Sequence, residues 1–210
     1  MIAWAMAKHL TLAAEAHLEV DPIKRSRFIA CGAPVSSAEE AMDFVGRVRG
    51  EYPDAGHHCF AWRLGTGDTG FRVSDDGEPG GTAGLPILNH VDGAGLRNVV
   101  IVVVRYFGGT KLGKGGLIRA YGGTAGALIR DAEVIEVEET SPLYIRCTYG
   151  DQGAVQGVLR EHGLAVSESA YGDAVDLTVH APIEERERIE LALREATGGR
   201  CRVHSETLAQ

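Results

Sequence analysis

The feature that most constrains the fold of this chain is the stretch Arg105–Gly126, RYFGGTKLGKGGLIRAYGGTAG. It follows a run of apolar residues, Val99–Val104, whose length and β-branched side chains are typical of a fully buried strand. Several glycines come next, and an apolar periodicity typical of a helix resumes at Leu117. The sequence therefore predicts a buried strand, a glycine-rich turn and a helix, in that order.

The same stretch is positively charged in an otherwise acidic protein. The formal net charge is −8, yet Gly93–Arg130 contains six basic residues and no Asp or Glu. Glycine lets another group approach the backbone closely, and amides at a helix N-terminus attract anions. We therefore predict a phosphate- or nucleic-acid-binding turn made by Arg105, Gly108, Gly109, Lys111, Lys114, Gly115, Gly116 and Arg119. The alternative is a tight turn whose charged side chains only face water.

A nucleotide site of the P-loop type is a narrower interpretation of this turn. Gly108–Lys114 fits the first part of the pattern, G-x-x-x-x-G-K, but Gly115 follows where a Ser or Thr hydroxyl would bind magnesium. No second apolar strand ending in Asp is evident to supply the other magnesium contact. The sequence therefore predicts no ATP hydrolysis and no bound cofactor.

An acidic loop precedes this region, in Ser74–Leu88, SDDGEPGGTAGLPIL. Its Asp-Gly and Pro-Gly pairs mark turns, and Thr82 is expected to cap a short helix that runs through Leu88. Carboxylates in such a loop hold magnesium or act as acid and base in some proteins, although turn geometry and solvation also explain them. The residues of a possible rim or functional loop are His57, His58, Asp75, Asp76 and Glu78.

Metal binding and catalysis by a thiol are both disfavoured by the sequence. Neighbouring residues of a strand point to opposite faces, so the run His57-His58-Cys59 places at most two donors on one side. A structural zinc site usually needs four donors at wider spacing. We therefore assign no metal ligand and no catalytic residue.

Composition sets the broad class of the protein. A hydrophobic content of 44% with 24% charged residues is ordinary for a soluble globular protein. The four cysteines are far apart and form no C-x-x-C pair, which predicts reduced thiols in a cytoplasmic protein. Nothing approaches the roughly 18 apolar residues that span a bilayer, so no membrane association is expected.

Two domains are predicted, 1–138 and 139–210, because charges cluster at Glu138–Pro142 and a complete new pattern follows. That pattern contains a strand, a helix, two strands joined by a tight turn, and a second helix whose apolar stripe runs from Ile189 to Ala196. A last strand is expected at Arg200–Leu208. The order βαββαβ fits a ferredoxin-like fold.

Four segments of the first half resemble the YigZ/IMPACT family and occur in the family's order. They are Lys24–Ile29 (KRSRFI), Asp54–Trp62 (DAGHHCFAW), Ser74–Pro86 (SDDGEPGGTAGLP) and Val102–Leu117 (VVVRYFGGTKLGKGGL). Residues 142–208 resemble the small C-terminal domain of bacterial members. The resemblance implies an α+β fold in which the first domain looks like the second domain of small-subunit ribosomal protein five. The second domain would be ferredoxin-like, and the pair would resemble domains four and five of elongation factor G.

The family resemblance implies no settled biochemical activity. Eukaryotic relatives regulate translation through a starvation-sensing kinase pathway, and an association with RNA or the ribosome is inferred for bacterial members. We therefore predict a non-enzymatic or weakly enzymatic protein that associates with RNA or the ribosome and is linked to regulation of translation. Two alternatives stay open: a small hydrolase that uses the Ser74–Gly81 loop with His57 or His58, and a protein–protein regulator that contacts no nucleic acid.

Overall fold

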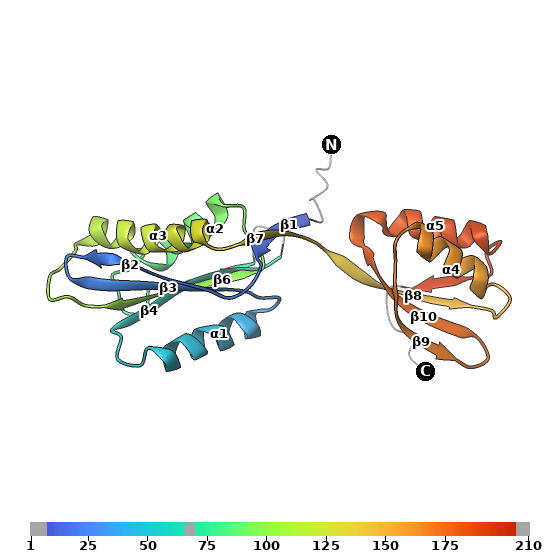
Figure 1. Cartoon of the computed structure of the whole chain (residues 1–210), viewed down its shortest axis with the longest axis horizontal. Helices are drawn as coiled ribbons and strands as arrows, with labels where there is room; N and C mark the ends of the chain where they lie inside the picture. The colour runs from blue at the N-terminus through green and yellow to red at the C-terminus, as the bar shows by residue number, and fades with distance from the viewer. Residues whose placement is uncertain (1–7, 66–69, 205–210) are drawn as a thin grey trace. The chain divides into compact units, whose positions relative to one another are not determined.

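The computed structural model describes residues 8–65 and 70–204 of the chain (Figure 1). Its internal contacts divide the protein into two units between Val137 and Glu138. Each unit has its own hydrophobic core and is described separately.

The first unit is built on a five-stranded sheet in the order β2-β3-β6-β4-β5, with every neighbouring pair antiparallel. The strands are β2 (Ala16–Ile23), β3 (Ser26–Pro34), β4 (His57–Arg63), β5 (Phe71–Ser74) and β6 (Val99–Tyr106). The helices are α1 (Ala38–Glu51), α2 (Gly84–Gly93) and α3 (Lys114–Asp131), and β1 (Lys8–Leu12) pairs with β7 (Val134–Glu138). Figure 1 shows α1 on one face of the sheet and α2 with α3 on the other.

Strand β6 lies at the centre of the sheet and is buried on both faces, as its apolar sequence predicts. Val99, Ile101 and Val103 pack in the core formed with α2 and α3. Val100, Val102 and Val104 pack in the core beneath α1. The glycine-rich loop directly follows a strand that is buried on both faces. The backbone position at the start of the loop is therefore fixed by the core of the sheet.

The second unit has the predicted ferredoxin-like arrangement. Its elements are β8 (Thr140–Cys147), α4 (Gln152–Glu161), β9 (Val166–Tyr171), β10 (Val175–Pro182), a short 3-10 turn (Ile183–Glu185), α5 (Arg186–Ala196) and β11 (Arg202–His204). The sheet order is β11-β8-β10-β9, and one face packs against both helices. The mixed α+β fold class is therefore confirmed.

Three details of the second unit differ from the sequence-based expectation. Ala196 is exposed because α5 ends there and its apolar stripe stops at Leu193. Pro142 lies inside β8 opposite His180, so the segment between the two units is shorter than predicted. The described part of the last strand covers Arg202–His204, and the rest of its predicted length lies outside the described residues.

Candidate functional site

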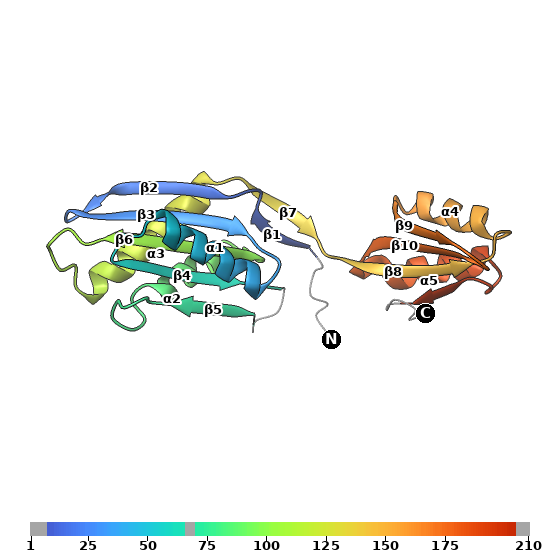
Figure 2. The same ribbon diagram turned by 90° about the horizontal axis from the view of Figure 1, so that it is seen from below.

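The turn between β2 and β3 packs directly against the glycine-rich loop that leads into α3. A Cβ atom at Gly108 would lie 2.0 Å from the carbonyl carbon of Arg25, so this position accepts only glycine. The Gly108 amide donates to the Ser26 hydroxyl at 3.1 Å, and the Arg25 guanidinium donates to the Thr110 hydroxyl at 3.0 Å. Figures 1 and 2 show both segments at the same end of the sheet.

Two basic residues form the tip of that hairpin turn. Lys24 and Arg25 have φ angles of 49° and 70°, in the left-handed region that Gly and Asn usually occupy in two-residue hairpins. The predicted site did not include these two residues. The signal that points to them is the pair of basic residues placed directly between two short strands.

The first turn of α3 adds main-chain donors to the same end of the sheet. The helix begins after Gly113, and its first hydrogen bond joins the Leu117 amide to the Gly113 carbonyl at 2.9 Å. The amides of Lys114, Gly115 and Gly116 precede that bond and have no acceptor within the helix. A Cβ atom on Gly115 would lie 3.8 Å from Nη1 of Arg119, so the Arg119 side chain folds back towards this first turn.

The exposed cations of the β2–β3 turn, the glycine-rich loop and the start of α3 form what we call the basic surface. Its members are Lys24, Arg25, Lys111, Lys114 and Arg119. Within residues 8–65 and 70–204, no carboxylate oxygen lies within 4.0 Å of the charged nitrogens of any of them. Neighbouring Arg27, by contrast, is paired with Glu19 at 2.8 Å. The basic surface therefore carries positive charge that no described acidic side chain neutralises.

Arg105 does not belong to the basic surface, although the sequence placed it with the phosphate-binding residues. Its side chain is buried, and Nη1 donates to Oε1 of Glu78 at 2.5 Å while Nη2 donates to the Ser26 hydroxyl at 3.3 Å. The guanidinium carbon lies 5.5 Å and 5.4 Å from the ring centroids of Phe28 and Phe107. Arg105 thus stabilises the glycine-rich loop from the protein interior, and a phosphate in solvent has no access to its guanidinium.

Asp75 in the acidic loop caps α2. Its carboxylate accepts the amides of Gly81, Ala83 and Gly84 at 2.8 to 2.9 Å. Burial raises the pKa of Asp75, but these amide hydrogen bonds together outweigh burial and lower the pKa below its ordinary value. The expectation that Thr82 caps this helix is wrong, because its hydroxyl donates instead to the Pro79 carbonyl at 2.6 Å.

The other two carboxylates of the acidic loop are also engaged. Asp76 accepts the His58 amide and the Arg49 guanidinium, each at 2.6 Å. The Glu78 side chain is 5% exposed, and its Oε1 accepts from both Arg105 and the Tyr121 hydroxyl, the latter at 2.7 Å. The acidic loop therefore stabilises this end of the sheet through the hydrogen bonds and ion pairs of its carboxylates.

The two histidines of β4 are held by main-chain carbonyls. A carbonyl only accepts, so Nδ1 of His57 donates to the Asp76 carbonyl at 2.8 Å and Nε2 of His58 donates to the Tyr52 carbonyl at 3.0 Å. Nε2 of His57 lies 3.8 Å from Oε1 of Glu78, and Nδ1 of His58 lies 3.8 Å from Oδ2 of Asp76. Both separations exceed hydrogen-bond distance, so neither carboxylate orients its histidine as in a hydrolase.

The thiol and metal chemistry of this end of the sheet is equally restricted. Cys59 is buried, its thiol donates to the Asp75 carbonyl at 3.0 Å, and burial raises the pKa of this thiol to about 12. A thiol that stays protonated at neutral pH is a poor nucleophile. In the described parts of the chain, no group of three or more His, Cys, Asp and Glu side chains is arranged to hold a metal ion.

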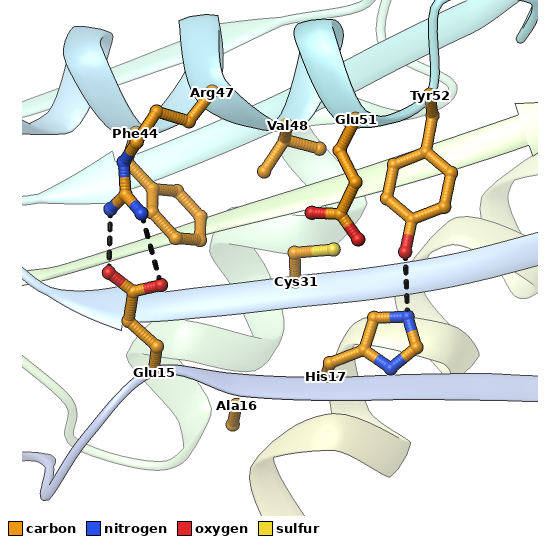
Figure 3. Close-up of a pocket in the computed structure, with 9 residues that line it drawn as sticks. All are labelled: Glu15, Ala16, His17, Cys31, Phe44, Arg47, Val48, Glu51 and Tyr52. Atoms are coloured by element: carbon orange, nitrogen blue, oxygen red, sulfur yellow. Dashed lines mark hydrogen bonds and ion pairs between the residues drawn. The ribbon is translucent and has the colours of Figure 1, made fainter.

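A separate cavity of about 220 Å³ lies between α1 and the strands β2 and β3 (Figure 3). Four of its polar side chains form two pairs: Arg47 binds both carboxylate oxygens of Glu15, and the Tyr52 hydroxyl lies 2.9 Å from Nε2 of His17. Burial also raises the pKa of the Cys31 thiol in this cavity to about 12. This cavity is on the α1 side of the sheet and contains no residue of the basic surface.

Fold and site together define a two-domain α+β protein whose first domain presents an unneutralised basic surface beside an engaged acidic loop. No helix among the described residues is long and apolar enough to cross a membrane.

The chain belongs to the IMPACT family, as its motifs predict. Residues 24–129 match the Impact N-terminal domain, and residues 145–200 match a domain of unknown function, DUF1949. An IMPACT family member encoded in the pol 5′ region of Thermus thermophilus is 42% identical over 76% of this chain and 86% of its own length. The IMPACT family member YigZ of Escherichia coli is 39% identical over 78% of this chain and 81% of its own length.

More distant and structural comparisons agree with this assignment. The Saccharomyces cerevisiae IMPACT homolog is 34% identical over 44% of this chain and 38% of its own length. A crystal structure described as that of a hypothetical protein is similar with a TM-score of 0.73 and 34% identity. The match covers 97% of this chain and the whole of that one.

Proposed function

We propose that this protein binds RNA, free or within the ribosome, through phosphate contacts made by the basic surface. One observation carries the proposal: five exposed cations lie on the β2–β3 turn, the glycine-rich loop packed against it and the start of α3, and no described carboxylate neutralises them. Like charges held together repel one another, and a polyanion relieves that repulsion. Cations and helix N-terminal amides are also the donors that commonly contact phosphate oxygens in nucleic-acid complexes.

A link to regulation of translation in the cytoplasm completes the proposal. The link to translation rests on the family resemblance. The cytoplasmic location is supported by the cysteines, since all four are free and buried and none forms a disulfide. Reduced thiols are usual in the cytoplasm and unusual in secreted domains of this size.

The test is the salt dependence of binding to single-stranded RNA. Each neutralised phosphate contributes about −0.7 to the log–log slope, so five contacts would give a slope of about −3.5 for the wild type. Replacing Lys111 and Lys114 together with glutamine should flatten that slope by about 1.4. The measurement is fluorescence anisotropy of a labelled oligonucleotide across a salt series.

A matched control comes from the second unit. Arg188 and Arg194 on α5 are exposed, and replacing both with glutamine changes the net charge of the protein by the same amount. The control variant should keep the wild-type slope. A lysine variant that folds normally and also keeps the wild-type slope would contradict the proposal, and a protein partner for this surface would then be the better hypothesis.

The hydrolase alternative receives no support from the geometry of the described residues. The carboxylates of the acidic loop are already hydrogen-bonded within the protein. Main-chain amides bind Asp75, Arg49 binds Asp76, and Arg105 and Tyr121 bind Glu78. A general base must reach the proton it abstracts within hydrogen-bond distance. The remaining histidine–carboxylate separations are too long to orient such a base.

A further inference from the structure

One aromatic ring stands exposed beside the basic surface. Phe107 directly follows β6 and precedes Gly108, and 56% of its surface is accessible to solvent. Among the described residues from 105 to 131, only Phe107 and Ile118 are large hydrophobic side chains with such exposure. Core packing does not explain a phenyl ring that is more than half exposed at this position.

The ring of Phe107 is backed by a fixed cation. The guanidinium carbon of Arg105 lies 5.4 Å from its ring centroid, within the range of a cation–π contact. Glu78 and Ser26 hold that guanidinium, and Ser26 also accepts the amide of Gly108. The ring is therefore supported from the protein side by groups that are buried and paired. Little conformational entropy is lost when such a supported side chain binds a ligand.

We propose that Phe107 is a stacking platform for an unpaired nucleobase, so that the protein prefers single-stranded RNA to duplex RNA. This inference rests on the proposed phosphate-binding function and adds the class of RNA. Bases within a duplex are stacked on one another and offer no free face to a side chain. Proteins that bind single strands combine cations that follow the backbone with aromatic rings on which the bases stack.

The surroundings of Phe107 favour a nucleobase over the apolar side chain of a protein partner. The core of a protein–protein interface is an apolar patch in which charged residues are depleted. Phe107 lies instead on the loop that carries Lys111 and leads to Lys114 at the start of α3, and that loop packs against the turn of Lys24 and Arg25. An exposed ring on the same loop as a cation without a described carboxylate partner matches a ligand in which flat bases alternate with phosphates.

The experiment compares two polyanions, a fluorescein-labelled oligouridylate and inorganic polyphosphate. Both carry phosphates, but only the first carries bases, and uridines stack weakly on one another and stay available. Phe107→Ala should weaken oligouridylate binding by about tenfold, because one stacked base is lost. The salt slope and the affinity for polyphosphate should not change, since the substitution removes no charge. Phe107→Trp should restore oligouridylate binding.

Phe71 offers a matched control in the same domain. It is also about half exposed, at 46%, and the Arg63 guanidinium carbon lies 5.5 Å from its ring centroid. Its strand partner Arg63 pairs with Val99, at the end of β6 opposite to Phe107. Phe71→Ala should therefore leave oligouridylate binding unchanged.

The outcomes separate this inference from the function on which it rests. If Phe107→Ala binds oligouridylate like the wild type, while the lysine variant flattens the salt slope, the stacking role is wrong and the phosphate contacts stand. Equal losses for both polyanions would also overturn the stacking role, because the substitution would then have disturbed the loop. If the wild-type protein binds neither polyanion, both proposals fail together.

Discussion

The acidic loop and the basic surface lie at the same end of the five-stranded sheet, yet their charges are used in opposite ways. Asp75, Asp76 and Glu78 each accept two or more hydrogen bonds from within the protein. Lys111 and Lys114 have no described carboxylate partner and face solvent. The difference shows that charged residues in glycine-rich loops must be judged by their partners and not by their number.

The two regions also differ in how much unfolding free energy is lost when one of their charged side chains is removed. A buried carboxylate that pairs with a cation leaves an unsatisfied charge behind when it is removed. An exposed cation without a partner leaves nothing behind. Substitutions in the acidic loop should therefore change the free energy of unfolding, and substitutions on the basic surface should change only the binding of anions.

The largest effect is expected for Glu78→Ala. The substitution leaves the buried guanidinium of Arg105 without its carboxylate and the Tyr121 hydroxyl without its acceptor. Breaking a buried pair in this way costs about 3–5 kcal/mol of unfolding free energy. Urea unfolding followed by tryptophan fluorescence measures the effect without a signal from the second unit, since Trp62 lies in β4 and residues 138–210 contain no tryptophan.

Glu133→Ala is the matched control for Glu78→Ala. Glu133 is exposed and lies in the same unit, between α3 and β7, so its removal should change the unfolding free energy by within ~0.5 kcal/mol. Equal stabilities of the two variants would mean that the acidic loop does not stabilise the end of the sheet. The acidic loop and the basic surface would then not differ in their contribution to stability.

An intermediate effect is expected for Asp75→Ala, which removes the acceptor of three amides at the start of α2. Loss of such a cap costs about 1–2 kcal/mol. The effect depends on pH. The pKa of Asp75 is lower in the folded protein than its ordinary value of 3.8, so its stabilising contribution is complete above that value and disappears as the pH falls through the folded-state pKa.

The pH dependence is checked by unfolding the wild type and Asp75→Asn between neutral and acidic pH. The asparagine keeps one acceptor oxygen but does not titrate, so the difference in stability between the two proteins should narrow as the pH falls below about 4. A difference that stays constant across this range would show that the charge of Asp75 contributes nothing to the cap.

The smallest effect on stability is expected for the double substitution Lys111→Gln with Lys114→Gln. Both side chains are exposed and unpaired among the described residues, so the free energy of unfolding should change by within ~0.5 kcal/mol. The same urea titration measures it. A loss of several kcal/mol would show that these lysines hold the loop together, and the basic surface would then resemble the acidic loop.

Much of the fold followed from local sequence patterns. The apolar run before Arg105 predicted the central strand, and the change from an apolar run to a helical periodicity at Leu117 predicted α3. The βαββαβ order of the second unit was predicted by the same means. These features are accessible because periodicity and glycine content act over a few neighbouring residues.

The partners of the charged side chains were decided only by the tertiary structure. Arg105 was grouped with the exposed cations because it is basic and adjacent to the glycines, but its partner Glu78 is 27 positions away. Arg25 was left out of the predicted site, and its contact with Thr110 spans 85 positions. Composition gives the charges of a loop, but which charges are buried and paired depends on strands that meet from distant parts of the chain. That pairing separates the structural acidic loop from the available basic surface.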